Sequence, residues 1–190
     1  RIGGYRWYFA KRGKSTVVVN ADGGRVSEIG LAVSELTGDR EAQRQLFERV
    51  KKQMFGVCLR FCDSRTDAED LLQEGFIRVF RDIGRYRGEG SLDGWVRRVF
   101  VRTAIEDFNR RKKLPQTVEL DRLENLLFEP ENFDPDDPDS AIALLQKLPP
   151  GFRAVLNLAV LEEKSHEEIA RALGITASTS RSQLTRAKAF

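Results

Sequence analysis

The sequence is poor in the residues that build metal and redox sites. Its 190 residues include one histidine, His166, and two cysteines, Cys58 and Cys62. A zinc site takes at least three nitrogen, sulfur or oxygen ligands from the protein, and two thiols cannot form a disulfide framework. We therefore expect no metal site and no cofactor. Both cysteines should be ordinary core or near-surface thiols in a reducing compartment.

Long apolar segments and common catalytic motifs are also missing. No apolar run approaches the roughly 20 residues that span a bilayer, and no signal-peptide pattern is visible. The sequence therefore predicts no membrane insertion and a cytoplasmic location. It also contains no evident nucleophile–base pair and no glycine-rich phosphate-binding motif. We expect no catalytic residues and a protein that is not an enzyme.

The acidic residues are distributed unevenly. The net charge is +3, yet residues 169–190 contain no Asp or Glu, whereas residues 114–139 contain nine acidic residues and one basic residue. Basic blocks therefore stand on both sides of an acidic strip. This arrangement suggests two nucleic-acid contacts joined by a linker.

Apolar residues recur at helical spacing over most of the chain, which predicts an all-α fold with two small helical domains. A glycine-rich loop should interrupt the first domain at residues 84–91, and four prolines fall in the acidic strip. The predicted parts are an N-terminal extension (1–33), a helical bundle (34–113), an acidic flexible linker (114–139) and a C-terminal helix-turn-helix domain (140–190).

The N-terminal extension has no role that the sequence assigns. A β-prone run at residues 16–19 lies between basic and glycine-rich pieces. A small hairpin, a flexible arm and sequence upstream of the natural start all remain open there. The only methionine is Met54, so nothing marks Arg1 as a natural start.

The C-terminal segment "SHEEIARALGITASTSRSQLTRAK" has the pattern of a helix-turn-helix. Ser165 and Glu168 have the spacing of a capping box, which predicts a helix start. Gly174 suits the turn, and Thr176 is a candidate cap for the second helix.

The second helix has an outward row of hydroxyl and Arg side chains, which bond bases or phosphates. Leu184 and Ala187 should face inward, with Ser180 one turn before them. An ordinary helical hairpin with a solvated face is the alternative. The candidate DNA-binding residues are Ser178, Thr179, Arg181, Ser182, Thr185 and Arg186.

Two further patterns lie in the first helical domain. Asp67, Asp70, Gln73 and Glu74 form one polar stripe at helical spacing, which is either a solvated face or a protein-docking surface. Beyond it, basic residues alternate with aromatic ones, as in sites that bind single-stranded DNA. Trp95 is expected in the core. The candidate DNA-binding residues here are Arg85, Tyr86, Arg87, Arg97, Arg98, Arg102, Arg110 and Arg111.

These motifs resemble the bacterial sigma factors of RNA polymerase. "DAEDLLQEGFIRVFRDIGRYRGEGSLDGWVRR" resembles sigma region 2, and "LPPGFRAVLNLAVLEEKSHEEIARALGITASTSRSQLTRAK" resembles region 4. Both occur in this order with a short linker and nothing like region 3 between them. The chain therefore resembles the extracytoplasmic-function (ECF) group of the sigma-70 family.

The resemblance implies a transcription initiation factor that guides core RNA polymerase to promoters and assists DNA melting. By resemblance, the stripe of Asp67, Asp70, Gln73 and Glu74 docks on the polymerase β′ clamp, and the β flap is a further contact of the chain on core polymerase. The loop at residues 85–91 helps to hold a flipped base of the −10 element, with the helix at residues 92–113 on the adjacent duplex. The second helix of the C-terminal motif recognises the −35 element.

The family pattern also implies an anti-sigma factor as a partner. Two positions depart from that pattern: Ser180 stands where an apolar residue is usual, and Arg102 where Asn is usual. A stand-alone helix-turn-helix regulator is the alternative function. It would bind DNA without polymerase, which separates the two hypotheses.

Overall fold

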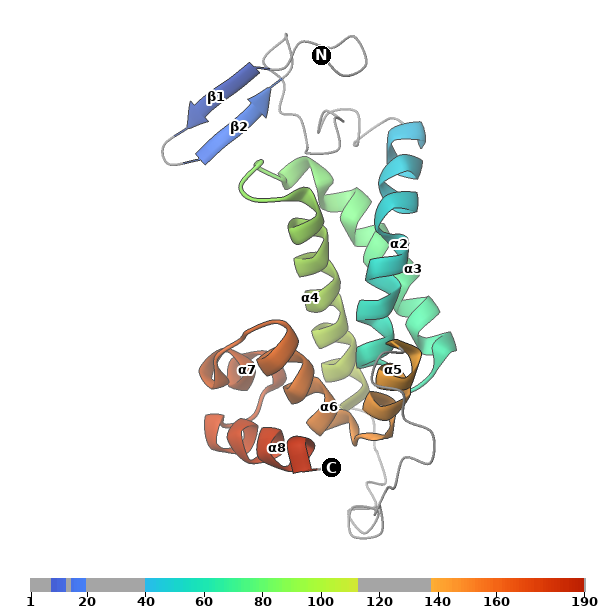
Figure 1. The fold of residues 1–190 in the computed structure, drawn as a ribbon, viewed down its shortest axis with the longest axis vertical. Coiled ribbons are helices and arrows are strands. Elements are labelled where there is room, and N and C mark those ends of the chain that lie inside the picture. Colours follow the sequence, from blue (N-terminus) through green and yellow to red (C-terminus); the bar gives the residue numbers. More distant parts are fainter. Residues whose placement is uncertain (1–7, 13–14, 20–39, 113–137, 190) are drawn as a thin grey trace. The chain divides into compact units, whose positions relative to one another are not determined.

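The computed structural model describes residues 8–12, 15–19, 40–112 and 138–189 (Figure 1). Apart from one β-hairpin, the regular structure in these ranges is helical, which confirms the all-α class for the two helical regions. The helices are α2 (Arg40–Phe61), α3 (Arg65–Asp82), η1 (Ile83–Arg85), α4 (Leu92–Lys112), α5 (Pro138–Lys147), α6 (Pro150–Leu156), the π-helical segment η3 (Asn157–Leu161), α7 (His166–Leu173) and α8 (Ala177–Ala189).

The hairpin realises one of the three alternatives for the N-terminal extension. Strand β1 (Tyr8–Arg12) pairs antiparallel with β2 (Ser15–Val19), with Tyr8 opposite Val19. Most of the predicted acidic linker (114–139), namely residues 114–137, lies outside the described residues. The boundaries of the predicted domains stay a prediction.

By its contacts the chain divides into two compact units. Unit 1 comprises residues 1–55 and 72–101, and unit 2 comprises residues 56–71 and 102–190. Helices α2, α3 and α4 each contribute one part to each unit.

An aromatic cluster fills the core of unit 1. The Phe76 ring lies 4.6 Å from that of Phe47 and 5.2 Å from that of Phe100, between ring centroids. Phe100 is fully buried and meets Phe76 edge-on, an arrangement that adds about 0.5–1.5 kcal/mol to the burial of the rings. The apolar stripes of α2, α3 and α4 therefore meet here, as their helical spacing predicts.

The core of unit 2 combines the end of α2 with the helices from α5 onward. Cys58 and Cys62 are both buried and free, and burial raises the pKa of each thiol to about 12. They are therefore protonated at neutral pH and act as apolar core residues, which confirms the prediction for them. Among the described residues, no cluster of His, Cys, Asp and Glu is suited to a metal ion.

Side-chain nitrogens of two buried polar residues, one in α6 and one in η3, bond to the end of α2 and to Asp63, two residues beyond it. Arg153 is 1% exposed and pairs with the carboxylate of Asp63. Asn157, also 1% exposed, donates from Nδ2 to the carbonyl of Arg60 at 2.5 Å. Buried polar groups without partners cost about 1–3 kcal/mol, so these bonds fix how α6 packs within unit 2.

Candidate functional site

The polar stripe of α3 is open to solvent at two of its four positions. Asp70 and Gln73 are exposed, and no hydrogen bond or ion pair engages their side chains within the described part of the chain. Glu74 is half-buried and forms an ion pair with Arg78 at 2.7 Å. The side chains of Asp70 and Gln73 are therefore accessible to a partner. A partner that binds Glu74 would compete with Arg78 for its carboxylate.

Asp67, the fourth member of the stripe, serves the fold. It lies in the first turn of α3, where its carboxylate accepts from the Ser64 hydroxyl at 2.7 Å and its backbone N–H donates back to that hydroxyl at 3.1 Å. Its other carboxylate oxygen lies 3.0 Å from the guanidinium of Arg111 on α4. The Ser64 hydroxyl, with the charge of Arg111, lowers the pKa of Asp67.

This lowered pKa makes the contribution of Asp67 dependent on pH. The contribution is complete above the ordinary carboxyl value of 3.8 and is lost as the pH falls through the lower folded-state value. Asp67→Asn removes the charge that faces Arg111 and should therefore cost up to about 1 kcal/mol of unfolding free energy at pH 7, the size of a partly exposed ion pair. The difference should shrink below about pH 4. Denaturant titrations of both proteins at a series of pH values measure it, and a pH-independent difference would contradict the account.

The loop after η1 is held by Tyr86 and by two glycines. Gly88 and Gly90 have φ of 71° and 75°, a conformation that L side chains rarely adopt. Tyr86 is only 3% exposed, donates from its hydroxyl to the carbonyl of Gly90 at 2.7 Å, and packs 5.9 Å from the Trp95 ring. The buried Tyr86 ring therefore stabilises the loop, and contacts with DNA would have to come from the exposed neighbours of Tyr86.

The basic candidates of this region differ in how accessible they are. Arg85, Arg87, Arg98, Arg102 and Arg110 are exposed, whereas Arg97 and Arg111 are half-buried. Arg102, at 81% side-chain exposure, pairs with Glu106 at 3.0 Å. Arg111 is bound by Asp67 at 3.0 Å and by Asp107 at 2.7 Å, which favours a structural role for it.

The helix-turn-helix is built as its sequence predicts. Ser165 and Glu168 form a complete capping box at the start of α7, and Gly174 ends the helix with φ of 61° and ψ of 44°. The Thr176 hydroxyl accepts from the backbone N–H of Thr179 at 3.0 Å, which caps α8. Local signals thus fix both helix starts and the turn between them.

The outward row of α8 is exposed except at one position. Ser178, Arg181, Ser182, Thr185 and Arg186 are exposed, and Thr179 is half-buried beside Thr176. Arg181 lies 3.6 Å from a carboxylate oxygen of Glu167, in a pair whose side chains are 58% and 66% exposed. Such a pair contributes little to stability, so Arg181 can exchange it for a new partner.

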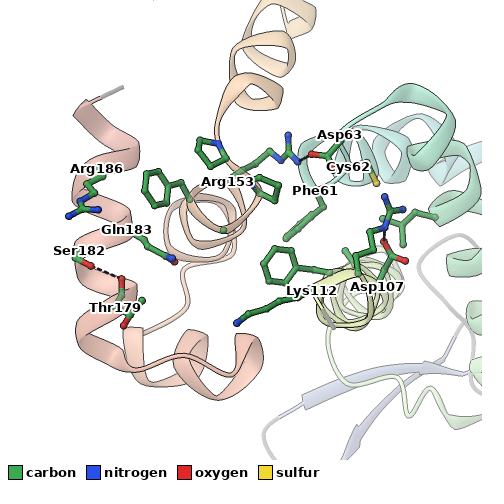
Figure 2. A pocket seen from close by; sticks show the side chains of 18 residues that line it. Phe61, Cys62, Asp63, Asp107, Lys112, Arg153, Thr179, Ser182, Gln183 and Arg186 are labelled. Carbon is green, nitrogen blue, oxygen red and sulfur yellow. Dashed lines mark hydrogen bonds and ion pairs between the residues drawn. The ribbon is translucent and has the colours of Figure 1, made fainter. Parts of the chain in front are cut away.

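A pocket of about 440 Å³ lies within unit 2, lined by residues of α2, α3, α4, α6 and α8 (Figure 2). Its walls mix aromatic rings such as Phe61 and Phe108 with polar side chains. Three candidate residues of α8, Thr179, Ser182 and Arg186, line it together with Gln183. Thr179 and Ser182 join through a bond from the Ser182 hydroxyl to the Thr179 carbonyl, at 3.0 Å.

Two family models match the chain in the order that the motifs predict. The model of sigma-70 region 2 matches residues 46–114, and the model of sigma-70 region 4 matches residues 139–190. The ECF RNA polymerase sigma factor SigE of Mycolicibacterium smegmatis is 34% identical in an alignment of 177 positions that covers 84% of this chain. The chain belongs to the ECF group of the sigma-70 family.

Other relatives have lower sequence identity but are matched over more of their length. The chain spans 65% of the M. smegmatis protein, and 84% of the RNA polymerase sigma-H factor of Pseudomonas aeruginosa, to which it is 27% identical over 80% of its own length. The ECF RNA polymerase sigma-E factor of Haemophilus influenzae is 28% identical over 80% of this chain and 86% of that protein.

Two solved structures are also similar to this chain. CnrH, in complex with the cytosolic domain of CnrY, aligns with a TM-score of 0.43 and 20% identity over 83% of this chain and 90% of that one. The sigma factor RpoE of Bartonella quintana, in complex with the anti-sigma factor NepR, aligns with a TM-score of 0.46 and 16% identity over 77% and 91% of the two chains.

Three exposed apolar residues of this sigma factor escaped the sequence analysis. Ile77 is 61% exposed and lies one turn after Gln73 and Glu74 on α3. Val160 and Leu161, in η3, are 49% and 40% exposed. The signal for Ile77 was its distance of seven residues from Asp70, which places both on one face of a helix.

Within the described ranges, every helix is too short or too polar to cross a membrane.

Proposed function

We propose that this sigma factor directs core RNA polymerase to promoters through three separate surfaces of its own. The observation that carries the proposal is the solvent exposure of two rows inside the matched regions. These rows are Asp70 and Gln73 on α3, in region 2, and Arg181, Ser182 and Thr185 on α8, in region 4. Side chains that the fold leaves exposed and polar at such places are available for binding partners.

The first surface docks core polymerase. Asp70, Gln73 and Glu74 bind the β′ clamp, and the exposed Ile77 adds an apolar contact beside them. Val160 and Leu161 offer a second apolar patch, which suits the β flap. Asp67 belongs to this surface only indirectly, because its carboxylate is bound by Ser64 and Arg111 and sets the start of α3.

The second surface binds the −10 element. The glycine-rich loop presents Arg85 and Arg87, and α4 presents Arg98 and Arg102 on its exposed side. These positive charges can pair with the phosphates of a single DNA strand, and a rigid loop can hold one unstacked base. Both features suit a melted DNA segment. Tyr86 holds the loop in shape for this contact. Arg97, Arg110 and Arg111 then support binding through charge and packing.

The third surface is α8, which enters the major groove at the −35 element. Arg181, Ser182, Thr185 and Arg186 lie on its exposed side, with Ser178 and Thr179 in its first turn. Arg bonds guanine edges or phosphates, and Ser and Thr bond either. The predicted acidic linker, outside the described residues, connects this surface to the other two.

The chain itself supplies binding and positioning, and the catalysis of RNA synthesis belongs to the polymerase. It acts in the cytoplasm, where the polymerase and the promoters are. An anti-sigma factor is proposed as its regulator, as in the complexes of the similar sigma factors.

Size-exclusion chromatography with bacterial core RNA polymerase tests the proposed function. The chain should co-elute with core polymerase, and promoter DNA should be bound specifically only by the complex. Duplex binding by the chain alone, with no affinity for polymerase, would instead identify a stand-alone regulator.

Arg181→Ala tests recognition of the −35 element. We expect the preference for the cognate −35 sequence to fall by about 1–3 kcal/mol, the size of one bidentate base contact. Electrophoretic mobility shifts of the holoenzyme on promoters with intact and scrambled −35 elements measure it. Arg171→Ala is the matched control, because Arg171 is an exposed arginine of α7 that donates to the Glu167 carbonyl. If Arg181→Ala weakens binding to every sequence equally, Arg181 contacts phosphate.

A further inference from the structure

A partly buried hydrogen bond joins α8, the proposed recognition helix, to α7. Ser180 of α8 is 0% exposed, and its hydroxyl lies 2.9 Å from Nδ1 of His166, the first residue of α7. His166 is the only histidine of the chain and is half-buried. Nothing in the sequence indicates that these two residues meet, because Ser180 stands where an apolar residue is usual and His166 belongs to none of the predicted DNA-binding rows.

The Ser180 hydroxyl differs from the other hydroxyls of α8 in the partner it has. Ser182 and Thr185 donate to backbone carbonyls of their own helix, at 3.0 and 3.1 Å. Ser180 instead bonds across to α7. A buried hydroxyl without a partner is costly, and a hydrogen bond is directional where an apolar contact is not. The bond therefore restricts both sliding and rotation of α8 against α7.

His166 is itself held in place. It directly follows Ser165, whose hydroxyl and backbone N–H both bond to Glu168 in the capping box. The next residue, Glu167, pairs with Arg181 at 3.6 Å. The first turn of α7 thus fixes the inner side of α8 through Ser180 and holds Arg181, on the outer side, through an exposed ion pair that DNA can displace.

We propose that His166 is a positioning residue for promoter recognition: through Ser180 it sets the angle at which α8 presents Arg181, Ser182 and Thr185 to the −35 element. The inference rests on the proposed function of α8. It goes beyond that function because His166 touches no base and acts through the orientation of the helix that does. Ser180 stands where the family usually has an apolar residue, so here a directional hydrogen bond to His166 takes the place of an apolar contact.

The two partners should separate stability from specificity. His166→Ala leaves the Ser180 hydroxyl buried and unpaired, so it should lower the melting temperature clearly. Ser180→Ala leaves unpaired a ring nitrogen of a residue that is only half-buried, so its melting temperature should change less. Both variants lose the tie between the helices. Both should therefore lower the preference for the best −35 sequence about tenfold, the size of a weakened base contact.

The specificity is measured with holoenzyme assembled from the full chain and core polymerase. It is allowed to bind a promoter pool with a randomised −35 segment and a constant −10 segment, and the bound DNA is sequenced. His166→Asn is the conservative control, because the Asn side chain carries a polar atom at the position of Nδ1. It should restore most of the preference, while His166→Ala and Ser180→Ala flatten it. The double variant, His166→Ala with Ser180→Ala, should regain the stability that His166→Ala loses. It should still show no preference among −35 sequences.

A second readout is the ¹⁵N spectrum of the imidazole. Because the chain has one histidine, its two ring nitrogens give the only imidazole signals. The Nδ1 signal should change in Ser180→Ala, as expected for a lost hydrogen bond. Wild-type selectivity in both single variants would overturn the positioning role. If the wild-type holoenzyme itself selects no −35 sequence, the proposed function of α8 fails instead.

Discussion

Reversing the charge of Asp70 and Glu74 together, as Asp70→Lys with Glu74→Lys, should weaken binding to core RNA polymerase at least 100-fold. Juxtaposing like charges in an interface costs several kcal/mol, and a 100-fold loss of affinity is about 2.7 kcal/mol. Asp70 is exposed and its side chain has no hydrogen bond or ion pair within the described part of the chain, so its replacement removes no such bond from the fold. Co-elution with core polymerase on a sizing column should disappear.

A matched control separates docking from general electrostatics. Glu41→Lys with Glu69→Lys makes the same change in net charge, and both residues lie on the exposed surface of α2 and α3 in short-range pairs with Arg44 and Arg65. This variant should bind polymerase within about threefold of the wild type. Both double variants should keep the unfolding free energy within about 1 kcal/mol, since exposed substitutions usually have small effects. Unchanged co-elution of Asp70→Lys with Glu74→Lys would move the docking surface elsewhere.

The structure leaves fewer accessible residues in the proposed polymerase-docking stripe of α3 than the helical spacing suggests. Helical periodicity places Asp67 on the same face as Asp70, but it carries no information on what else lies near that face. Arg111, 44 residues further along the chain, binds Asp67 at 3.0 Å. One candidate contact of polymerase and one candidate contact of DNA thus engage each other, and both are poorer targets for mutation than their neighbours.

Local features of the sequence predicted local features of the structure. The capping box of Ser165 and Glu168, the turn at Gly174 and the cap at Thr176 all formed where the pattern placed them. Each depends on residues within four positions of one another, so the sequence contains the whole signal. The loop after η1 was likewise marked by its glycines, two of which have positive φ.

Features that join distant residues could not be predicted in this way. The bond between His166 and Ser180 crosses the turn, and Tyr86 packs against Trp95, nine positions further along the chain. A hydroxyl on the inner side of a helix is recognised as satisfied only when its partner is seen. The exposure of Ile77 was hidden for the converse reason, because an isoleucine in an apolar pattern is usually assigned to the core.

Helix α3 has one face exposed to solvent and one face packed in the core. Its outward positions, Asp70, Gln73 and Ile77, remain exposed, while its inward positions, Gly75 and Phe76, are buried against α4. The polar face can be altered without changing the core, and the buried face cannot. The same helix should therefore give binding defects without instability on one face and instability on the other.

Gly75→Ala should be strongly destabilising for this reason. A Cβ at residue 75 would lie 2.6 Å from Cδ1 and from Cζ of Phe100, and closer still to Cε1. Phe100 is fully buried against Phe76, so its ring has no free space to move into. Overpacking of this kind costs about 1–3 kcal/mol. We expect about 2–3 kcal/mol from urea denaturation, and a melting temperature lower by roughly 5–10 °C.

Gly56→Ala is the matched control, since Gly56 also lies inside a helix, α2, and a Cβ there would meet nothing within 4 Å. Without a clash, alanine should stabilise the helix by about 0.5–1 kcal/mol, because glycine loses more backbone freedom on folding. The two substitutions add the same methyl group to the same kind of helix and should have opposite signs. Equal effects would mean that helix propensity, and not the Phe100 ring, decides the outcome at Gly75, and that α3 and α4 pack less closely there than the structure shows.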